Sequence, residues 1–245
     1  AYSEKAAEAS DALDALNKSQ EDAVDAIEDS STKGLQAVSM LESLSKRTEL
    51  TSGDLDTMSK YADYLNDTFN CDIVVNYDTG ELTGFDPAEV TQSIIDSANE
   101  RKIQQSIDFI TDADFTDKYT EAYKKYDELM KKKSTLQKAY DEMYKNADYD
   151  TFTYNGQFGQ VERDLQATNS ELETAKSLLG ECETALSEHG AAAEESGLSL
   201  DLYRKSLQET AVSGGELMSI AEKSSDTLTN QQAGIDAANG VIDEY

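Results

Sequence analysis

Small and apolar residues recur in this sequence at alternating intervals of four and three, the period at which α-helices pack side by side in coiled coils. The spacing occurs in four separate seams. The whole chain holds a single Pro, so the main breaker of long helices is almost absent. Hydrophobic residues make up 38% of the chain, enough to fill a narrow seam but not a thick core. We therefore predict a mainly α fold of long antiparallel helices and coiled-coil hairpins.

The first and fourth seams are long and rich in small residues. The first comprises Tyr2, Ala6, Ala9, Leu13, Leu16, Gln20, Ala23, Ile27, Ser30, Gly34, Ala37, Leu41 and Leu44. The fourth comprises Leu200, Tyr203, Leu207, Thr210, Gly214, Leu217, Ala221, Ser224, Leu228, Gln231, Ile235, Ala238 and Ile242. They predict an N-terminal stalk helix over 1–48, with a bend near Gly34, and a C-terminal stalk helix over 198–245, with an interruption near Gly214-Gly215. We favour antiparallel pairing of these two helices within the chain; the alternative is that each seam pairs with another chain.

The second and third seams predict an antiparallel helical hairpin over 115–193. The second seam comprises Phe115, Tyr119, Ala122, Tyr126, Leu129, Lys133, Leu136, Tyr140, Met143 and Ala147. The third comprises Val161, Leu165, Thr168, Leu172, Ala175, Leu179, Cys182 and Leu186. Residues 148–157 lie between them, show no helical period and predict the connecting loop. Large Tyr side chains on one helix are expected to face small Ala, Thr and Cys on the other.

Between the first two seams the pattern changes and predicts a small α+β insert over 49–114. Thr51 and Asp54 have the spacing of a capping box, so a short helix should follow them. A β-branched run and an Asp-Thr-Gly turn then predict a β-hairpin at about 72–83, with Gly80 in a left-handed conformation. The apolar face of this hairpin should pack on a helix, because a lone hairpin is marginally stable in water.

A further helix is predicted from Pro87, because Asp86 can cap it and Pro suits the first helical position. Two continuations are open. The helix runs unbroken into the second seam, which gives roughly sixty residues or about 90 Å at the helical rise. Alternatively, it kinks near Asp112-Ala113-Asp114.

The net charge of −29, from 50 acidic residues against 21 Lys and Arg, excludes several functions. So negative a surface repels phosphate backbones and anionic membranes, so we expect no nucleic-acid binding by this segment. The basic run Lys131-Lys132-Lys133 is too short to reverse this, and predicts a solvated helix face. No apolar run is long enough to cross a bilayer, so we expect no membrane segment.

Residue types that carry chemistry are few and scattered. The only histidine, His189, lies beside Gly190 at a predicted helix end, where a cationic side chain suits free carbonyls. Cys71 and Cys182 match no zinc, redox or disulfide spacing, and we expect free thiols, with Cys182 buried in its seam. The pair Gly214-Gly215 lacks the preceding strand and following Lys of a phosphate loop.

Two acidic groups could in principle gather a hard cation. Asp112, Asp114 and Asp117 lack the glycine and distant glutamate of an EF-hand, so we interpret them as a polar helix break. Asp148 and Asp150 have the same interpretation. We therefore expect no catalytic, cofactor-binding or metal-binding residue, no cofactor and no enzymatic activity.

Four aromatic residues gather at the predicted tip of the helical hairpin. They are Tyr149, Phe152, Tyr154 and Phe158. We favour local packing of the loop as their role. The alternative is a contact site at the end of a long arm.

The stretch 41–82 resembles a segment of the tail tape-measure proteins of long-tailed phages and prophages of Gram-positive bacteria. The residues that carry the resemblance are Leu44-Ser45, Thr48, Leu50-Thr51, Tyr64-Leu65-Asn66 and Tyr77-Asp78-Thr79-Gly80-Glu81-Leu82. In the family, residues often intervene between the Asp and the Thr-Gly, whereas here they adjoin. The flanking acidic helices are also similar in style, and the chain is identified on this basis as a fragment of such a protein.

The resemblance implies a structural, non-catalytic coiled-coil segment inside the phage tail, which sets tail length during assembly. It also implies self-association or binding to other tail proteins, and a place in the tail of a prophage-encoded virion. The alternative function is a coiled-coil arm of a bacterial surface or secreted protein that binds a partner through its head. In that case the chain would lie at the bacterial cell surface.

Overall fold

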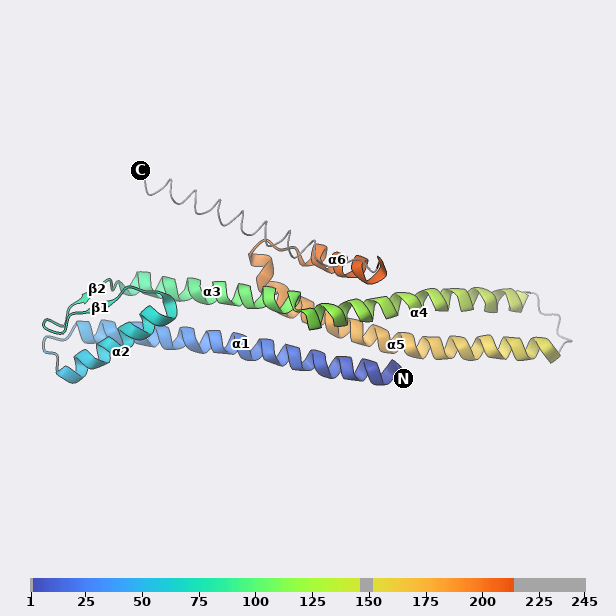
Figure 1. The fold of residues 1–245 in the computed structure, drawn as a ribbon, viewed down its shortest axis with the longest axis horizontal. Helices are drawn as coiled ribbons and strands as arrows, with labels where there is room; N and C mark the ends of the chain where they lie inside the picture. The colour runs from blue at the N-terminus through green and yellow to red at the C-terminus, as the bar shows by residue number, and fades with distance from the viewer. Residues whose placement is uncertain (1, 146–151, 214–245) are drawn as a thin grey trace, which may run out of the picture. The chain divides into compact units, whose positions relative to one another are not determined.

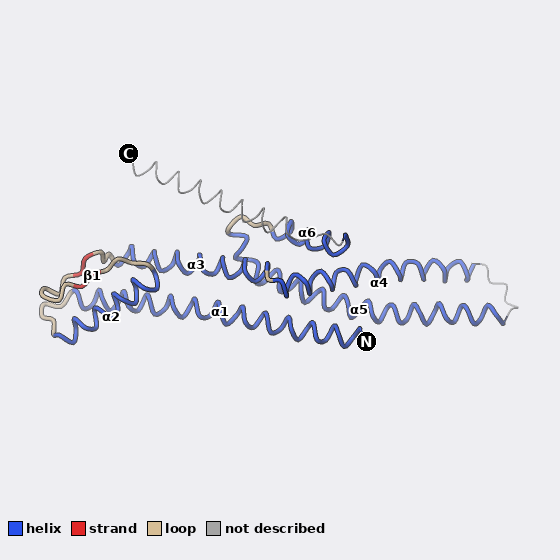
Figure 2. Tube along the Cα trace, in the orientation of Figure 1, coloured by secondary structure: helices blue, strands red, loops and turns tan. Residues whose placement is uncertain are grey.

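The computed structural model describes residues 2–145 and 152–213, and within these ranges the fold is mainly α with one small β-hairpin (Figures 1 and 2). The elements in chain order are α1 (Tyr2–Ser45), α2 (Ser52–Phe69), β1 (Val74–Val75), β2 (Leu82–Thr83), α3 (Pro87–Thr111), α4 (Ala113–Lys145), α5 (Phe152–Glu195) and α6 (Leu200–Ser213). The predicted fold class is confirmed. Every described residue of the four predicted seams is buried or half-buried, because the coiled-coil spacing keeps those positions on one helix face.

The chain divides into two compact units. The hairpin unit comprises Ala1–Lys18 and Ser106–Tyr245, and the insert unit comprises Ser19–Gln105. Each has its own apolar clusters. The long helices α1 and α3 contribute residues to both units.

The hairpin unit is built around α4 and α5, which pack side by side along their seams (Figure 1). Large residues of α4 share a cluster with small residues of α5, as Tyr119 does with Cys182 and Ala185. The short helix α6 packs on both of these helices. The first turns of α1 complete the packing through Ala6, which meets Ala122 and Leu178.

Helix α5 begins at Phe152, inside the stretch 148–157 that we predicted to be a loop. That part of the prediction is wrong. The physical reason is a contact with α4, because the Phe158 ring packs on the Tyr140 ring at a centroid distance of 4.6 Å. Pairing with α4 thus supports helix where the local sequence shows no helical period.

A single residue, Asp112, separates α3 from α4, so of the two continuations the kink is correct and the unbroken helix is wrong. The Asp112 carboxylate accepts hydrogen bonds from the backbone N–H groups of Asp114 at 2.8 Å and Phe115 at 3.2 Å. It therefore caps α4 in the usual manner of an aspartate before a helix. The rings of Phe109 and Phe115 pack across the break at 5.0 Å.

In the insert unit, the second half of α1 packs on α2 and on the start of α3, around a core that includes Leu41, Leu65 and Ile94. The predicted capping box of α2 is present: the Asp54 N–H donates to the Thr51 hydroxyl, and the Thr51 N–H donates to the Asp54 carboxylate at 2.9 Å. These bonds to Thr51 hold the pKa of Asp54 below its usual value. The helix ends at Asn70, which has a left-handed φ of 54°.

The β-hairpin pairs Val74 with Thr83 and Val75 with Leu82 in antiparallel register. The hairpin spans 74–83, in agreement with the predicted 72–83, and residues 76–81 connect its two short strands. Gly80 has a φ of 74°, as predicted, and donates its N–H to the Asn76 carbonyl at 2.7 Å. A Cβ at this position would lie 2.2 Å from Leu50 Cδ1, so the turn also packs closely on the chain before α2.

The apolar face of the hairpin lies in the core of the insert unit, which confirms the predicted packing on a helix. Ile73 is buried there, and Val75 and Leu82 are partly buried. Asn66 of α2 fixes the entry to β1, since its side-chain amide donates to the Ile73 carbonyl and accepts from the Ile73 N–H, both at 2.9 Å.

Helix α1 continues through Gly34, where we had predicted a bend. A Cβ at Gly34 would lie 2.7 Å from Phe69 Cε2 and 3.2 Å from Ile94 Cδ1. The close approach of α2 and α3 to α1 therefore explains the glycine at this position.

In the described part of the chain, the first seam shares apolar clusters with residues of α2, α3, α4, α5 and α6. We predicted that it pairs with the fourth seam. Of that seam, only the residues in α6 are described, and they pack on α4 and α5. Residues 214–245, including Gly214-Gly215, lie outside the described residues.

One seam position offers a direct test of this packing. The Thr168 hydroxyl on α5 is fully buried and has no hydrogen-bond partner in the described structure. Replacing Thr168 by Val removes an unsatisfied polar group at nearly constant shape, so we expect stabilisation by about 1 kcal/mol. Urea unfolding followed by circular dichroism measures the change.

Thr116→Val is the matched control. Thr116 is also buried, but its hydroxyl donates to the Ala113 carbonyl at 3.1 Å, so the same substitution should destabilise by about 1 kcal/mol. Equal signs for the two variants would contradict the assignment of Thr168 as unsatisfied.

Candidate functional site

Among the described residues, the most connected group of polar side chains joins α4, α5 and α6 in the hairpin unit. The Tyr119 hydroxyl donates to the Glu183 carboxylate and accepts a hydrogen bond from the Gln208 amide at 3.2 Å. The Arg204 Nε donates to the other Glu183 oxygen at 2.6 Å. We call Tyr119, Glu183, Arg204 and Gln208 the α6 clamp, because they tie α6 to the two long helices.

The electrostatic properties of the α6 clamp suit hydrogen bonding between helices better than proton transfer to a substrate. Burial, reinforced by the hydrogen bond to Glu183, raises the pKa of Tyr119, so its phenol stays protonated and remains a donor. The hydrogen bond to Glu183 likewise raises the pKa of Arg204, whose charge is permanent. Since a proton-transfer group works best with a pKa near the working pH, this phenol is poorly suited to general acid–base catalysis.

A second set of hydrogen bonds joins α3 to α5 and to α6. The buried Tyr203 hydroxyl donates to the Ile110 carbonyl at 2.6 Å, near the end of α3. The buried Ser106 hydroxyl donates to the His189 carbonyl and accepts the Ala193 N–H at 3.1 Å. Side chains thus bond to the backbone where α3, α5 and α6 meet, which fixes the helices in register as well as in contact.

His189 lies inside α5, which continues to Glu195, so the predicted helix end at Gly190 is wrong. The glycine has a packing reason instead: a Cβ at Gly190 would lie 2.7 Å from Leu200 Cδ2. The His189 ring packs edge-on against the Phe109 ring at 4.7 Å. Its surroundings are therefore those of a packed aromatic side chain.

Both cysteines are free thiols, as predicted, and they lie in different units. Cys182 is fully buried in the α4–α5 seam, and burial raises its pKa to about 12. Cys71 is partly buried, and burial raises its pKa as well. Neither thiol has the lowered pKa of a reactive cysteine.

The acidic candidates do not assemble a site. Asp112 caps α4, while Asp114 and Asp117 are exposed. Within the described ranges, no three His, Cys, Asp or Glu side chains are placed to hold a metal ion together. Asp148 and Asp150 lie outside the described residues.

Of the aromatic tip, Phe158 packs on Tyr140, as the interpretation of local packing requires. Tyr149 lies outside the described residues, and the side chains of Phe152 and Tyr154 are not described. In the basic run, Lys131 and Lys132 are exposed, which confirms the solvated face for those two residues, whereas Lys133 is half-buried on the seam. Lys131 pairs with Asp127 one turn earlier at 2.5 Å.

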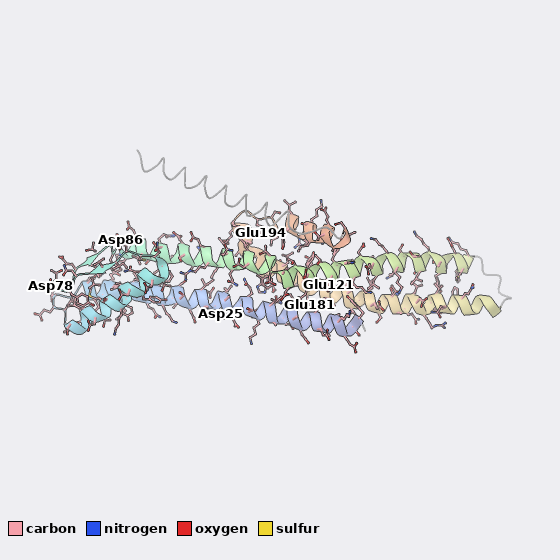
Figure 3. The ribbon with its side chains drawn as sticks, in the orientation of Figure 1. Asp25, Asp78, Asp86, Glu121, Glu181 and Glu194 are labelled. Carbon is pink, nitrogen blue, oxygen red and sulfur yellow. The ribbon has the colours of Figure 1, made fainter. Side chains whose placement is uncertain are left out.

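Acidic side chains line the surfaces of both units (Figure 3). Asp25, Asp78 and Asp86 are exposed in the insert unit, and Glu121 in the hairpin unit. Glu181 is half-buried and accepts a hydrogen bond from the Ser10 hydroxyl at 2.6 Å, which ties α1 to α5. Among the helices that the structure describes, none has the length and apolar character needed to cross a membrane.

Sequence reasoning missed most of the α6 clamp. Its Tyr119 is a seam residue, but Glu183, Arg204 and Gln208 lie off the seams, where polar residues are the rule. No local pattern distinguishes them from solvated neighbours. The comparisons with known proteins add no relative: no protein-family model, curated protein or solved structure matches the chain.

Two helical glycines of α5 separate packing from helix propensity. Around Gly180 there is open space, so Gly180→Ala should stabilise by about 1 kcal/mol through propensity alone. Gly190→Ala brings the same gain but places a methyl group against buried Leu200, so we expect net destabilisation. The urea concentration at the midpoint of unfolding shows whether each variant is stabilised or destabilised. A stabilised Gly190→Ala variant would contradict the close contact.

The buried phenols also predict a dependence of stability on alkaline pH. Burial raises the pKa of Tyr119 and Tyr203 above the ordinary value of 10.0, so the folded state holds these protons more tightly than the unfolded chain. Their contribution is present in full below pH 10.0 and is lost as the pH rises further. The free energy of unfolding, measured from about pH 9 to about pH 11.5, should fall less steeply in Tyr119→Phe/Tyr203→Phe.

Tyr144→Phe is the control for that experiment, because Tyr144 is 65% exposed. Its pH profile should match that of the unsubstituted protein. Parallel profiles for all three proteins would show that the two buried phenols do not control the alkaline transition.

Proposed function

We propose that this chain is a structural, non-catalytic coiled-coil segment of a phage tail tape-measure protein, which sets tail length during assembly. The observation that carries the proposal is where the residues of the resemblance lie. Leu44, Leu50, Tyr64 and Leu65 belong to a single apolar cluster of the insert unit. Sequence positions that are spread over the stretch 41–82 thus form one folded module.

The polar residues of the resemblance also have defined roles in that module. Asn66 bonds the backbone of Ile73, Thr51 caps α2, and Gly80 forms the hairpin turn against Leu50. These are the residue types that such positions require physically. Their agreement with the family pattern supports the proposal because each matched residue has a structural role in the module.

The helical character of the chain supports a spacer role. Helices α1 and α5 each have 44 residues, and their seams are buried within the chain. The best-connected polar group, the α6 clamp, binds helices to one another through a protonated phenol and a paired carboxylate. These contacts hold the helices in fixed positions, as a length-setting protein requires, and they involve no chemical reaction.

Tail length is the test. An in-frame deletion of all 245 residues should shorten tails. The upper limit is about 370 Å, the length of one continuous helix at about 1.5 Å per residue, and the antiparallel packing of α4 and α5 makes the expected shortening smaller. Electron microscopy of purified particles measures the length. Tyr119→Phe, which keeps the number of residues, should leave it unchanged.

Tails of unchanged length in the deletion variant would contradict the proposal. Failure of antibodies against the chain to detect it in purified tails would also contradict the proposal.

A second candidate is a coiled-coil arm of a bacterial surface or secreted protein that binds a partner through the insert unit. Large apolar side chains that remain exposed on this unit favour it: Leu35, Met40, Val74, Tyr77 and Ile95. Neighbouring genes distinguish the two candidates, since tail-tube genes accompany a tape measure and wall-anchor genes accompany a surface arm.

A further inference from the structure

A groove of about 590 Å³ runs between α1 and α2 on the insert unit, within the size range of ligand-binding sites. Its lining comprises Lys33, Gln36, Ser39 and Met40 of α1, and Lys60, Tyr61 and Tyr64 of α2. The Tyr64 hydroxyl donates to the Ser30 carbonyl at 3.0 Å, which anchors that ring against α1. The walls are thus two packed helices, and the groove does not depend on a loop.

The apolar part of the lining remains open to solvent. Met40 is 42% exposed, although the seam residues that precede and follow it in α1, Ala37 and Leu41, are fully buried. The rings of Tyr61 and Tyr64 are partly buried and belong to the edge of the core cluster. A thioether and two aromatic rings together suit an apolar side chain of a partner, since Met adapts its shape to what it contacts.

The charge of the groove is opposite to that of the chain. Of 245 residues 50 are acidic, yet none lines the groove, and each helix supplies one lysine. Both lysines are exposed, and among the described residues neither forms an ion pair with a carboxylate. A second pocket, in the hairpin unit, is lined by four lysines and also by Glu121 and Glu128, so carboxylates offset part of its positive charge, whereas no carboxylate lines the groove.

We propose that this groove binds an acidic amphipathic helix of a partner protein. One apolar side chain of the partner lies on Met40 and the two tyrosine rings, and carboxylates flanking it reach Lys33 and Lys60. Amphipathic helices bind grooves between helices in this way, with apolar residues as anchors at intervals of three and four. Opposite charges at the rim select an acidic partner over a basic one.

The inference does not depend on the assignment to a phage tail. It needs only the groove, its lysines and its exposed apolar lining. A negative result in the tail-length experiment would therefore not contradict the groove, which is tested by peptide binding.

Methionine methyl groups of the full chain provide the readout. Met40 and Met130 are almost equally exposed, at 42% and 43%, but only Met40 lines the groove. The probe is a synthetic helical peptide with leucine at every third or fourth position and glutamate and alanine elsewhere. On titration of ¹³C-methyl-methionine protein, the Met40 signal should shift and the Met130 signal should stay. Met40→Leu and Met130→Leu assign the two signals.

Charge reversal tests the lysines. Lys33→Glu/Lys60→Glu should weaken binding of the acidic peptide at least tenfold, measured by fluorescence anisotropy at constant salt. Lys131→Glu/Lys132→Glu makes the same change in net charge on exposed residues of α4, and should leave the affinity within twofold. Circular dichroism establishes that both double variants keep their helix content.

Several results would overturn the proposal. They are absence of a Met40 shift, equal shifts of Met40 and Met130, equal weakening by the two double variants, and tighter binding of a peptide with lysine in place of glutamate. A solution mass above 26.9 kDa that returns to that value in Lys33→Glu/Lys60→Glu would assign the groove to a second copy of the chain, and would also overturn it.

Discussion

The close approach of α4 and α5 depends on an exchange of large and small side chains across their shared seam. Phe115 and Tyr119 on one helix are fully buried because Cys182 and Ala185 on the other leave room for them. The same rule brings α1 close to α2, where Gly34 admits the ring of Phe69. A chain with few large apolar residues can bury them completely only if small residues face them. The positions of the small residues therefore decide which helices can meet.

Polar contacts then fix register where small apolar seams do not. Ala-rich surfaces pack almost equally well after a shift of one turn, whereas a phenol bonded to one carboxylate does not. The bond from Tyr119 to Glu183 holds α4 at one position on α5, and the bond from Tyr203 to the Ile110 carbonyl holds α6 at one position on α3. Asn66 has the same effect on the β-hairpin, because it bonds both backbone groups of Ile73. Each unit thus combines apolar seams that allow more than one register with a few hydrogen bonds that select one register.

Elements set by short-range physics were predictable from the sequence. The seams, the capping box at Thr51, the Asp86-Pro87 helix start and the left-handed Gly80 all follow from local spacing and residue type. Features that depend on distant contacts were not. The start of α5 follows from pairing with α4, and position 190 requires a glycine because Leu200 packs where a Cβ would lie. The α6 clamp and the groove join residues far apart in the chain, so no local pattern reveals them.

Each unit contains a single cysteine, Cys71 in the insert unit and Cys182 in the hairpin unit. A thiol reagent attacks the thiolate and needs access to sulfur, so a buried thiol reacts only while its surroundings open. The rate at which each thiol is modified therefore reports how often its own unit opens. Because Cys182 is fully buried and Cys71 only partly so, the two thiols should react at different rates, and the opening of both units can be followed in one molecule without an added label.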